Sequence, residues 1–256
     1  ISFLVNVCSS LAENVEAKGR YYFGFDISKN EACERAREKS EKNALSKVLG
    51  ENLTSEGVMH CNETGDEEAC KHYTSIWTIV SGIIRDMEET NRTILYDEEI
   101  KSDFCEVVIS ADVISAIGER DPSFDLKVTL NEKFFRNQEN LKITIIPNGS
   151  MYINIFNWSP HKREKVDLIF PNEYDHNNLV ESKIEIPSPY STKKYKFRLD
   201  FPVIMTKPIE EFIMVVATRD NIDFMEQYDL NSLKERINEI GLEDRREVTT
   251  SYILAK

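Results

Sequence analysis

The residues that could do chemistry are scattered along the chain, and the most site-like group is a polar segment at residues 171–178. Its carboxylate and amide oxygens, from Asn172, Asp175 and Asn177, are of the kind that hold a hard cation such as calcium. Asn and Asp side chains also cap the backbone of ordinary turns. We therefore expect a loop that presents itself to a ligand or partner, with no resident metal.

No motif of a known catalytic spacing occurs in the chain. There is no GxSxG elbow, HExxH helix, P-loop or GxGxxG turn. The histidines lie in polar surroundings, and the acidic runs Glu88-Glu89 and Asp97-Glu98-Glu99 are typical of solvated turns. We therefore expect no catalytic residues, no cofactor and no enzymatic activity.

The cysteines and the first residues together predict export. Residues 1–7 are an apolar run, and Ser10-Leu11-Ala12 fits the small-x-small pattern of signal-peptidase cleavage after Ala12. The alternative is an edge strand. Lipidation of Cys8 is disfavoured because Val7, not a small residue, precedes it. Residues 1–12 are thus interpreted as the remnant of a signal peptide, and an oxidising compartment would permit disulfides.

Four cysteines follow this segment, and we expect them to form two disulfides. Cys61 and Cys70 enclose a short acidic loop, which leaves Cys33 to pair with Cys105. Zinc is the alternative for the first pair, with His60 or His72, but no CxxC spacing supports it.

Composition excludes two classes of partner. The chain has 256 residues and a net charge of −13, which disfavours nucleic acid because phosphates are bound by Lys and Arg. No stretch reaches the roughly 18 apolar residues of a transmembrane helix. One basic cluster, Lys193, Lys194, Lys196 and Arg198, lies on a predicted strand. It either guards an edge against pairing or binds an anionic polymer or lipid headgroup.

Residues 13–118 predict an α+β domain of β-α-β-β order, with a helix packed on a small antiparallel or mixed sheet. Apolar residues alternate from Val15 to Phe25, and Ser28 with Glu31 predicts a capped helix that runs to Leu49. A second, shorter helix is predicted at 67–80 and two strands at 82–96 and 104–114. Cys105 alternates onto the face that the helix should cover.

Residues 122–256 predict a β-sandwich of about seven or eight strands, Ig-like or jelly-roll-like. Short alternating segments are separated by turn residues such as Pro147-Asn148-Gly149, and a helix at 232–240 precedes a last strand at 248–254. We expect Val166, Leu168 and Phe170 to face the core, since they alternate. Pro171 should end that strand and Asn172 should cap the turn.

Two resemblances give these domains a context. Gly149 to Asn157, Leu168-Ile169-Phe170-Pro171-Asn172 and Val216-Ala217-Thr218-Arg219 resemble a bacterial all-β family of unknown function, found in envelope proteins and beside Ser/Thr kinase modules. Val15-Glu16-Ala17-Lys18-Gly19, the Ala-rich helix and Glu106 to Val113 are similar to the N-terminal domain of the flagellar assembly protein FlgT and to related outer-membrane lipoproteins.

These resemblances imply an exported, non-catalytic bacterial cell-envelope protein, periplasmic or associated with the outer membrane. It would act as an interaction or assembly module for an envelope protein partner. The alternative is a glycan- or peptidoglycan-binding module, with Tyr152, Trp158 and Tyr174 as stacking residues.

Overall fold

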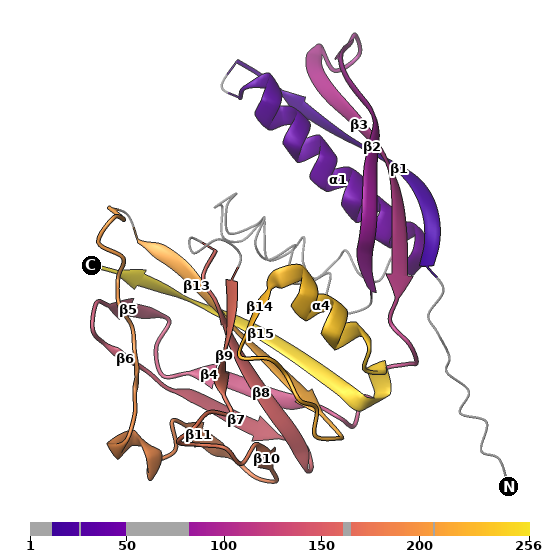
Figure 1. Cartoon of the computed structure of the whole chain (residues 1–256). Coiled ribbons are helices and arrows are strands. Elements are labelled where there is room, and N and C mark those ends of the chain that lie inside the picture. The colour runs from indigo at the N-terminus through magenta and orange to yellow at the C-terminus, as the bar shows by residue number, and fades with distance from the viewer. Residues whose placement is uncertain (1–11, 26, 50–81, 161–164, 207) are drawn as a thin grey trace, which may run out of the picture. The chain divides into compact units, whose positions relative to one another are not determined.

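The computed structural model describes residues 12–25, 27–49, 82–160, 165–206 and 208–256 (Figure 1). The chain divides into two compact units, residues 1–117 and 118–256. The predicted cleavage segment up to residue 11, the helix at 67–80 and the Cys61–Cys70 pair lie outside the described residues. No helix in the described part of the chain is both long and apolar enough to cross a membrane.

The first unit is an α+β fold with one helix on a three-stranded sheet. It contains β1 (Ala12–Phe23), α1 (Lys29–Leu49), β2 (Gly82–Asp97) and β3 (Ser102–Ser115). The sheet order is β1-β3-β2, and β3 is antiparallel to both neighbours. β1 and β2 therefore run parallel to each other, as expected for strands separated by a crossover helix. Figure 1 shows α1 lying along one face of this sheet.

Small residues let α1 approach the sheet closely. Its buried stripe includes Ala32, Ala36 and Ser40, and it faces Ala17 and Gly19 of β1. A Cβ at Gly19 would lie 2.1 Å from the Ala36 carbonyl oxygen, so only glycine fits at this contact. The helix begins where Ser28 Oγ accepts a hydrogen bond from the Glu31 backbone N–H (3.2 Å), as the capping pattern predicts.

A disulfide joins this helix to the central strand. Cys33 of α1 and Cys105 of β3 are bonded, with their Cα atoms 5.1 Å apart and 72 positions between them in the sequence. Both residues are buried in the core between α1 and the sheet. The predicted Cys33–Cys105 pairing is confirmed.

The second unit is rich in β-structure and contains one α-helix among its described residues. A three-stranded sheet has the order β11-β7-β4, and a two-stranded sheet pairs β12 with β6. These strands are β4 (Leu126–Leu130), β6 (Asn140–Leu141), β7 (Ile143–Pro147), β11 (Ile184–Ile186) and β12 (Phe197–Arg198).

The largest sheet has seven strands in the order β14-β9-β8-β13-β15-β5, with β10 paired to β8. Its strands are β5 (Phe134–Arg136), β8 (Met151–Trp158), β9 (Lys165–Phe170), β10 (Leu179–Val180), β13 (Ile209–Thr218), β14 (Gln227–Asp229) and β15 (Arg245–Ala255). Pairing is antiparallel except between β15 and β5, which are parallel. This parallel pair is a feature that the expectation of an all-β sandwich did not include.

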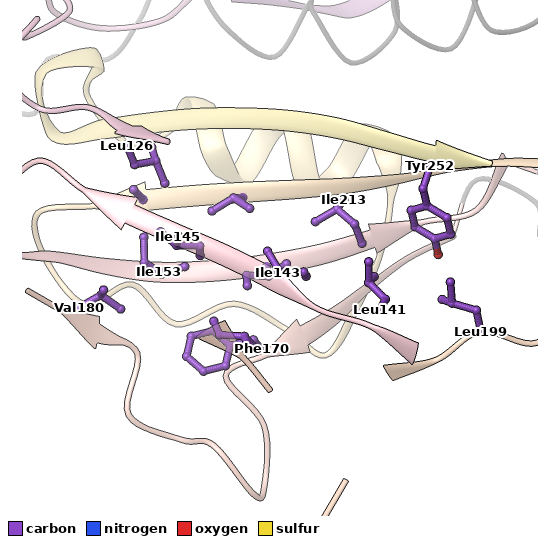
Figure 2. Close-up of a cluster of buried hydrophobic side chains, with 14 of the residues drawn as sticks. Leu126, Leu141, Ile143, Ile145, Ile153, Phe170, Val180, Leu199, Ile213 and Tyr252 are labelled. Atoms are coloured by element: carbon purple, nitrogen blue, oxygen red, sulfur yellow. The ribbon is translucent and has the colours of Figure 1, made fainter. Parts of the chain in front are cut away.

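Two hydrophobic layers hold this unit together. Figure 2 shows the inner cluster, where Ile143 and Ile145 of β7 lie against Ile153 of β8 and Ile213 of β13. The opposite face of the large sheet is covered in part by α4 (Leu230–Asn238), which lies against β14 and β9. Each β13 residue from Phe212 to Ala217 is consequently buried, because both faces of that strand are covered.

A β-bulge changes the direction of side chains along β9. Ile155 of β8 opposes Phe170, but the next pairing passes over Ile169 and uses Leu168. Phe170 therefore points into the inner cluster (Figure 2), whereas Val166 is buried on the opposite face and Leu168 is half-buried. The prediction that Val166, Leu168 and Phe170 share the core face is wrong, since the inserted residue interrupts the alternation.

Candidate functional site

The loop at 171–178 is a capped turn that begins where β9 ends. Asn172 Oδ1 accepts hydrogen bonds from the backbone N–H groups of Tyr174 (2.9 Å) and Asp175 (3.0 Å). Its amide nitrogen donates to the Ile169 carbonyl (2.8 Å). The strand stops at Phe170, directly before Pro171. The predicted capping role of Asn172 is thus confirmed.

Asp175 fixes this loop to the segment that follows β11. Its carboxylate accepts hydrogen bonds from the hydroxyls of Ser191, Ser188 (3.3 Å) and Tyr195 (2.9 Å), and from the Ser188 backbone N–H (3.3 Å). Ser188 Oγ also lies 2.9 Å from Ser191 Oγ, so the two hydroxyls are within hydrogen-bond distance of each other. A half-buried carboxylate therefore joins two loops that are separated in the sequence.

The environment of the Asp175–Tyr195 hydrogen bond shifts the pKa values of both side chains. Partial burial alone would raise the pKa of Asp175, but the hydrogen bonds from Ser191, Tyr195 and Ser188 outweigh it, so the pKa lies below its ordinary value. Burial, together with the neighbouring Asp175 carboxylate, raises the pKa of Tyr195 to about 12. Asp175 is therefore anionic and Tyr195 neutral at physiological pH.

These hydrogen bonds within the protein occupy the oxygens that are predicted to bind a ligand. Both oxygens of Asp175 accept hydrogen bonds from the protein, and Asn177 Oδ1 accepts one from the Leu179 backbone N–H (3.3 Å). Within the described residues, no three His, Cys, Asp or Glu side chains lie close enough together to hold a metal ion. The loop is built as a structural corner.

The two aromatic candidates on β8 differ: Tyr152 pairs with Leu179 of β10, directly after the loop, whereas Trp158 is enclosed in the core. Trp158 is 2% exposed and packs on Phe212, with ring centroids 5.0 Å apart. A ring enclosed in this way cannot stack on a glycan, so the interpretation of Trp158 as a stacking residue is wrong. Tyr152 is half-buried and alternates with the core residues Met151 and Ile153.

Each of the two joined loops has an exposed tyrosine, and one of them lies beside a lysine. Tyr174 is 42% exposed, and its ring is stacked on Tyr195 with centroids 5.4 Å apart. Tyr190 is 76% exposed, and the ammonium group of Lys194 lies 4.9 Å from its ring centroid. Sequence reasoning missed Tyr190, because a single aromatic residue in a Ser/Pro turn contributes to no periodic pattern.

Of the predicted basic cluster, only Arg198 lies on a strand. Residues Ser191–Lys193 form a 3₁₀ helix, and only Phe197–Arg198 pair as strand β12. The cause is local: Ser188 accepts a hydrogen bond from the Thr192 N–H (2.9 Å) at its carbonyl and one from the Ser191 N–H (3.1 Å) at its hydroxyl. These bonds coil the chain and leave Lys193 and Lys194 exposed on a turn.

Other polar groups of this unit are buried and stabilise the sheet. Glu211 accepts hydrogen bonds from Ser159 Oγ (2.8 Å) and from the Tyr252 hydroxyl, and all three residues are buried. Burial raises the pKa of Tyr252, and the Glu211 carboxylate adds to that shift. Solvent does not reach these groups, so they connect β13 to β15 and are no candidates for substrate chemistry.

Comparison with known proteins matches part of the second unit. Residues 135–221 match the family described as Domain of unknown function (DUF4384). Curated proteins give no match to the chain. The matched segment runs from β5 past the end of β13 and contains both joined loops. The C-terminal part of this chain is therefore similar to a domain of unknown function, and the Asp175 corner lies inside it.

Proposed function

We propose that this protein is a non-catalytic interaction module of the bacterial cell envelope, exported to the periplasm or the outer membrane. The observation that carries the proposal is that polar side chains of the second unit stabilise its loops, while aromatic and basic side chains of the same loops are exposed. Asn172 and Asp175, which could have served a ligand, hold the backbone in place, while Tyr174, Tyr190 and Lys194 lie at the surface. Exposed tyrosines on a fixed scaffold are typical of binding surfaces.

The first unit supports the location. A buried disulfide between α1 and β3 is stable in an oxidising compartment and rare in a reducing cytosol. The β-α-β-β order with one covered sheet face fits the proposed likeness to the FlgT N-terminal domain and related lipoproteins. In this proposal the first unit attaches the protein to an envelope assembly and the second unit, as a sandwich-like β-domain, presents the binding surface.

Location can be tested by thiol labelling in cells. Cells that express the chain are treated with a maleimide polymer after denaturation, with and without prior reduction. We expect Cys33 and Cys105 to be labelled only after reduction, and the protein to separate with the envelope fraction. Labelling of both cysteines without reduction, in protein recovered from the cytosol, would contradict export.

A glycan-binding module is the second candidate, and the exposed ring of Tyr174 is the observation that favours it. Co-sedimentation with insoluble peptidoglycan separates the two functions. We expect the chain to remain in the supernatant when purified peptidoglycan is pelleted, and to enter a stoichiometric complex when an envelope extract is added. Sedimentation with peptidoglycan alone, lost in Tyr174→Ala, would favour the glycan function instead.

A further inference from the structure

Exposed tyrosines and lysines lie on the joined loops of the second unit. We name this group of residues the tyrosine–lysine surface, and it consists of Tyr174, Tyr190, Lys193, Lys194 and Lys196. Contacts connect its parts: Tyr174 stacks on Tyr195, the Tyr195 hydroxyl donates to Asp175 (2.9 Å), and Asp175 also binds Ser191 in the turn that carries the lysines.

The backbone beneath this surface is held by hydrogen bonds. Ser191 accepts bonds at its carbonyl from the N–H groups of Lys194 (2.7 Å) and Tyr195 (3.0 Å), and its side chain is fully buried. Tyr190 directly precedes this turn, so its position is set by the same bonds. Side chains that are already positioned lose less conformational entropy on binding.

The lysines of this surface are available to a partner. All three are exposed, and no ion pair joins them to any described carboxylate. Arg198 differs, since it lies 3.7 Å from Asp200. In a chain of net charge −13, three lysines without a carboxylate partner form a local positive region that an anionic partner would complement.

We propose that the tyrosine–lysine surface binds an acidic segment of a protein partner. The rings of Tyr190 and Tyr174 would supply rigid apolar contact area, and the lysines around them would pair with Asp or Glu side chains of that segment. This inference rests on the proposed function and specifies the chemistry of the partner.

The chemistry of the surface favours an acidic polypeptide over an anionic glycan. Sugar hydroxyls are both donors and acceptors, so carboxylate and amide side chains at the surface suit them. Two groups of that kind beside the rings, Asp175 and Asn172, already bond within the protein. The exposed groups around the rings are the three ammonium groups, Glu173, which bonds the Tyr174 hydroxyl, and His176 and Asn177 of the same loop. The ammonium groups and phenol rings suit carboxylates and apolar side chains.

Poly-L-glutamate is the probe for this proposal, and its binding to the full chain is measured by calorimetry at low and moderate salt. The test variant reverses the charge of the surface: Lys193→Glu, Lys194→Glu and Lys196→Glu. We expect its affinity to fall by about tenfold or more, because three attractive charge pairs are replaced by repulsions. Binding of the unaltered chain should weaken as salt is raised.

A matched control changes the same net charge elsewhere in the unit. It carries three substitutions of exposed lysines outside the surface: Lys127→Glu, Lys165→Glu and Lys256→Glu. We expect it to bind poly-L-glutamate within about threefold of the unaltered chain, since the remaining effect is long-range and screened. Equal losses in the two variants, or no binding by the unaltered chain, would overturn the proposal.

The rings and the ligand class are tested separately. Tyr190→Ala should weaken binding, whereas Tyr190→Phe should retain it, because the ring rather than the hydroxyl makes the contact. Unfolding midpoints of all variants should be unchanged.

Tighter binding of polygalacturonate than of poly-L-glutamate would assign the surface to an anionic glycan, and binding only to phosphatidylglycerol vesicles would assign it to lipid. Either result overturns the proposal.

The proposed function can survive a failure of this inference. If poly-L-glutamate does not bind but the full chain still forms a stoichiometric complex in envelope extract, and the charge-reversed variant forms it equally well, only the assignment of the surface is wrong. If the full chain forms no such complex, the proposed function itself is wrong.

Discussion

Asp175 is the single residue on which the joined loops depend most, and its ionisation couples them to pH. Its pKa in the folded unit lies below the ordinary aspartate value, so the folded state favours the carboxylate. Such a group stabilises the fold above the unfolded pKa of about 3.9, and this stabilisation is lost as the pH falls through the lower folded pKa.

We therefore expect Asp175→Asn to lower the free energy of unfolding at pH 7, with a difference from the unaltered chain that narrows below about pH 4. Urea unfolding at pH 7 and pH 3 measures both values. A difference that stays the same at pH 3 would mean that the side chain acts through its shape and not through its charge.

The bulge in β9 makes Phe170 and Leu168 unequal although they alternate in the sequence. Phe170 is buried in the inner cluster, whereas Leu168 is half-buried on the opposite face. Phe170→Ala should lower the free energy of unfolding by about 3–5 kcal/mol, and Leu168→Ala by distinctly less. Denaturant unfolding compares the two variants. Equal losses would indicate that both side chains enter the same core, without a bulge.

Among the elements, α1 and β1 are the clearest case in which sequence determines packing. Small residues on α1 and Gly19 on β1 bring the two backbones together, and a Cβ at Gly19 would lie 2.4 Å from the Ser40 backbone nitrogen. Gly19→Ala should destabilise the first unit by about 1–3 kcal/mol, the usual cost of overpacking.

The neighbouring exposed position provides the control for this prediction. Lys18→Ala places alanine at a solvent-facing residue of β1, and we expect a change within about 0.5 kcal/mol. Thermal unfolding followed by circular dichroism measures both. The same effect from the two substitutions would show that close approach of α1 is not what constrains Gly19.

How far these elements could be predicted depends on the range of the interactions that form them. The capping pattern at Ser28 and the alternation along β1 are local, so α1 and β1 are predicted nearly to their ends. The Asn172 turn is local as well. The bulge at Ile169 depends on pairing with β8, a non-local interaction that alternation does not indicate. The coil at Ser191 is different, because its cap by Ser188 is local, and there the alternating pattern gives the wrong prediction although a capping signal is present.

Local sequence patterns also predict the candidate site only in part. Asn172, Asp175 and Asn177 were correctly placed in one loop, but their hydrogen bonds to structure rather than to ligand depend on partners such as Tyr195, 20 positions away from Asp175. Trp158 was selected for its ring, although burial removes that ring from solvent. Tyr190 carries no sequence signal of exposure, so only the structure identifies it.

At the scale of the whole molecule, each unit has a core of its own, and only the first contains the described disulfide. Replacing both Cys33 and Cys105 with Ala should lower the free energy of unfolding of the first unit by about 4 kcal/mol, the loop-closure value for cysteines 72 positions apart. The second unit should be unaffected. Calorimetry should therefore show one transition move and the other stay, whereas a shift of both would indicate a single cooperative molecule.

The central claim, that this chain acts by binding an envelope protein through its second unit, is tested most directly by cross-linking in cells. The photoreactive amino acid p-benzoylphenylalanine is placed at position 190 or, as a control, at the exposed position 225 of the same unit. We predict a discrete protein adduct from position 190 in the envelope fraction and none from position 225. No adduct from position 190, the same adducts from both positions, or an adduct removed by glycan hydrolysis would contradict the account.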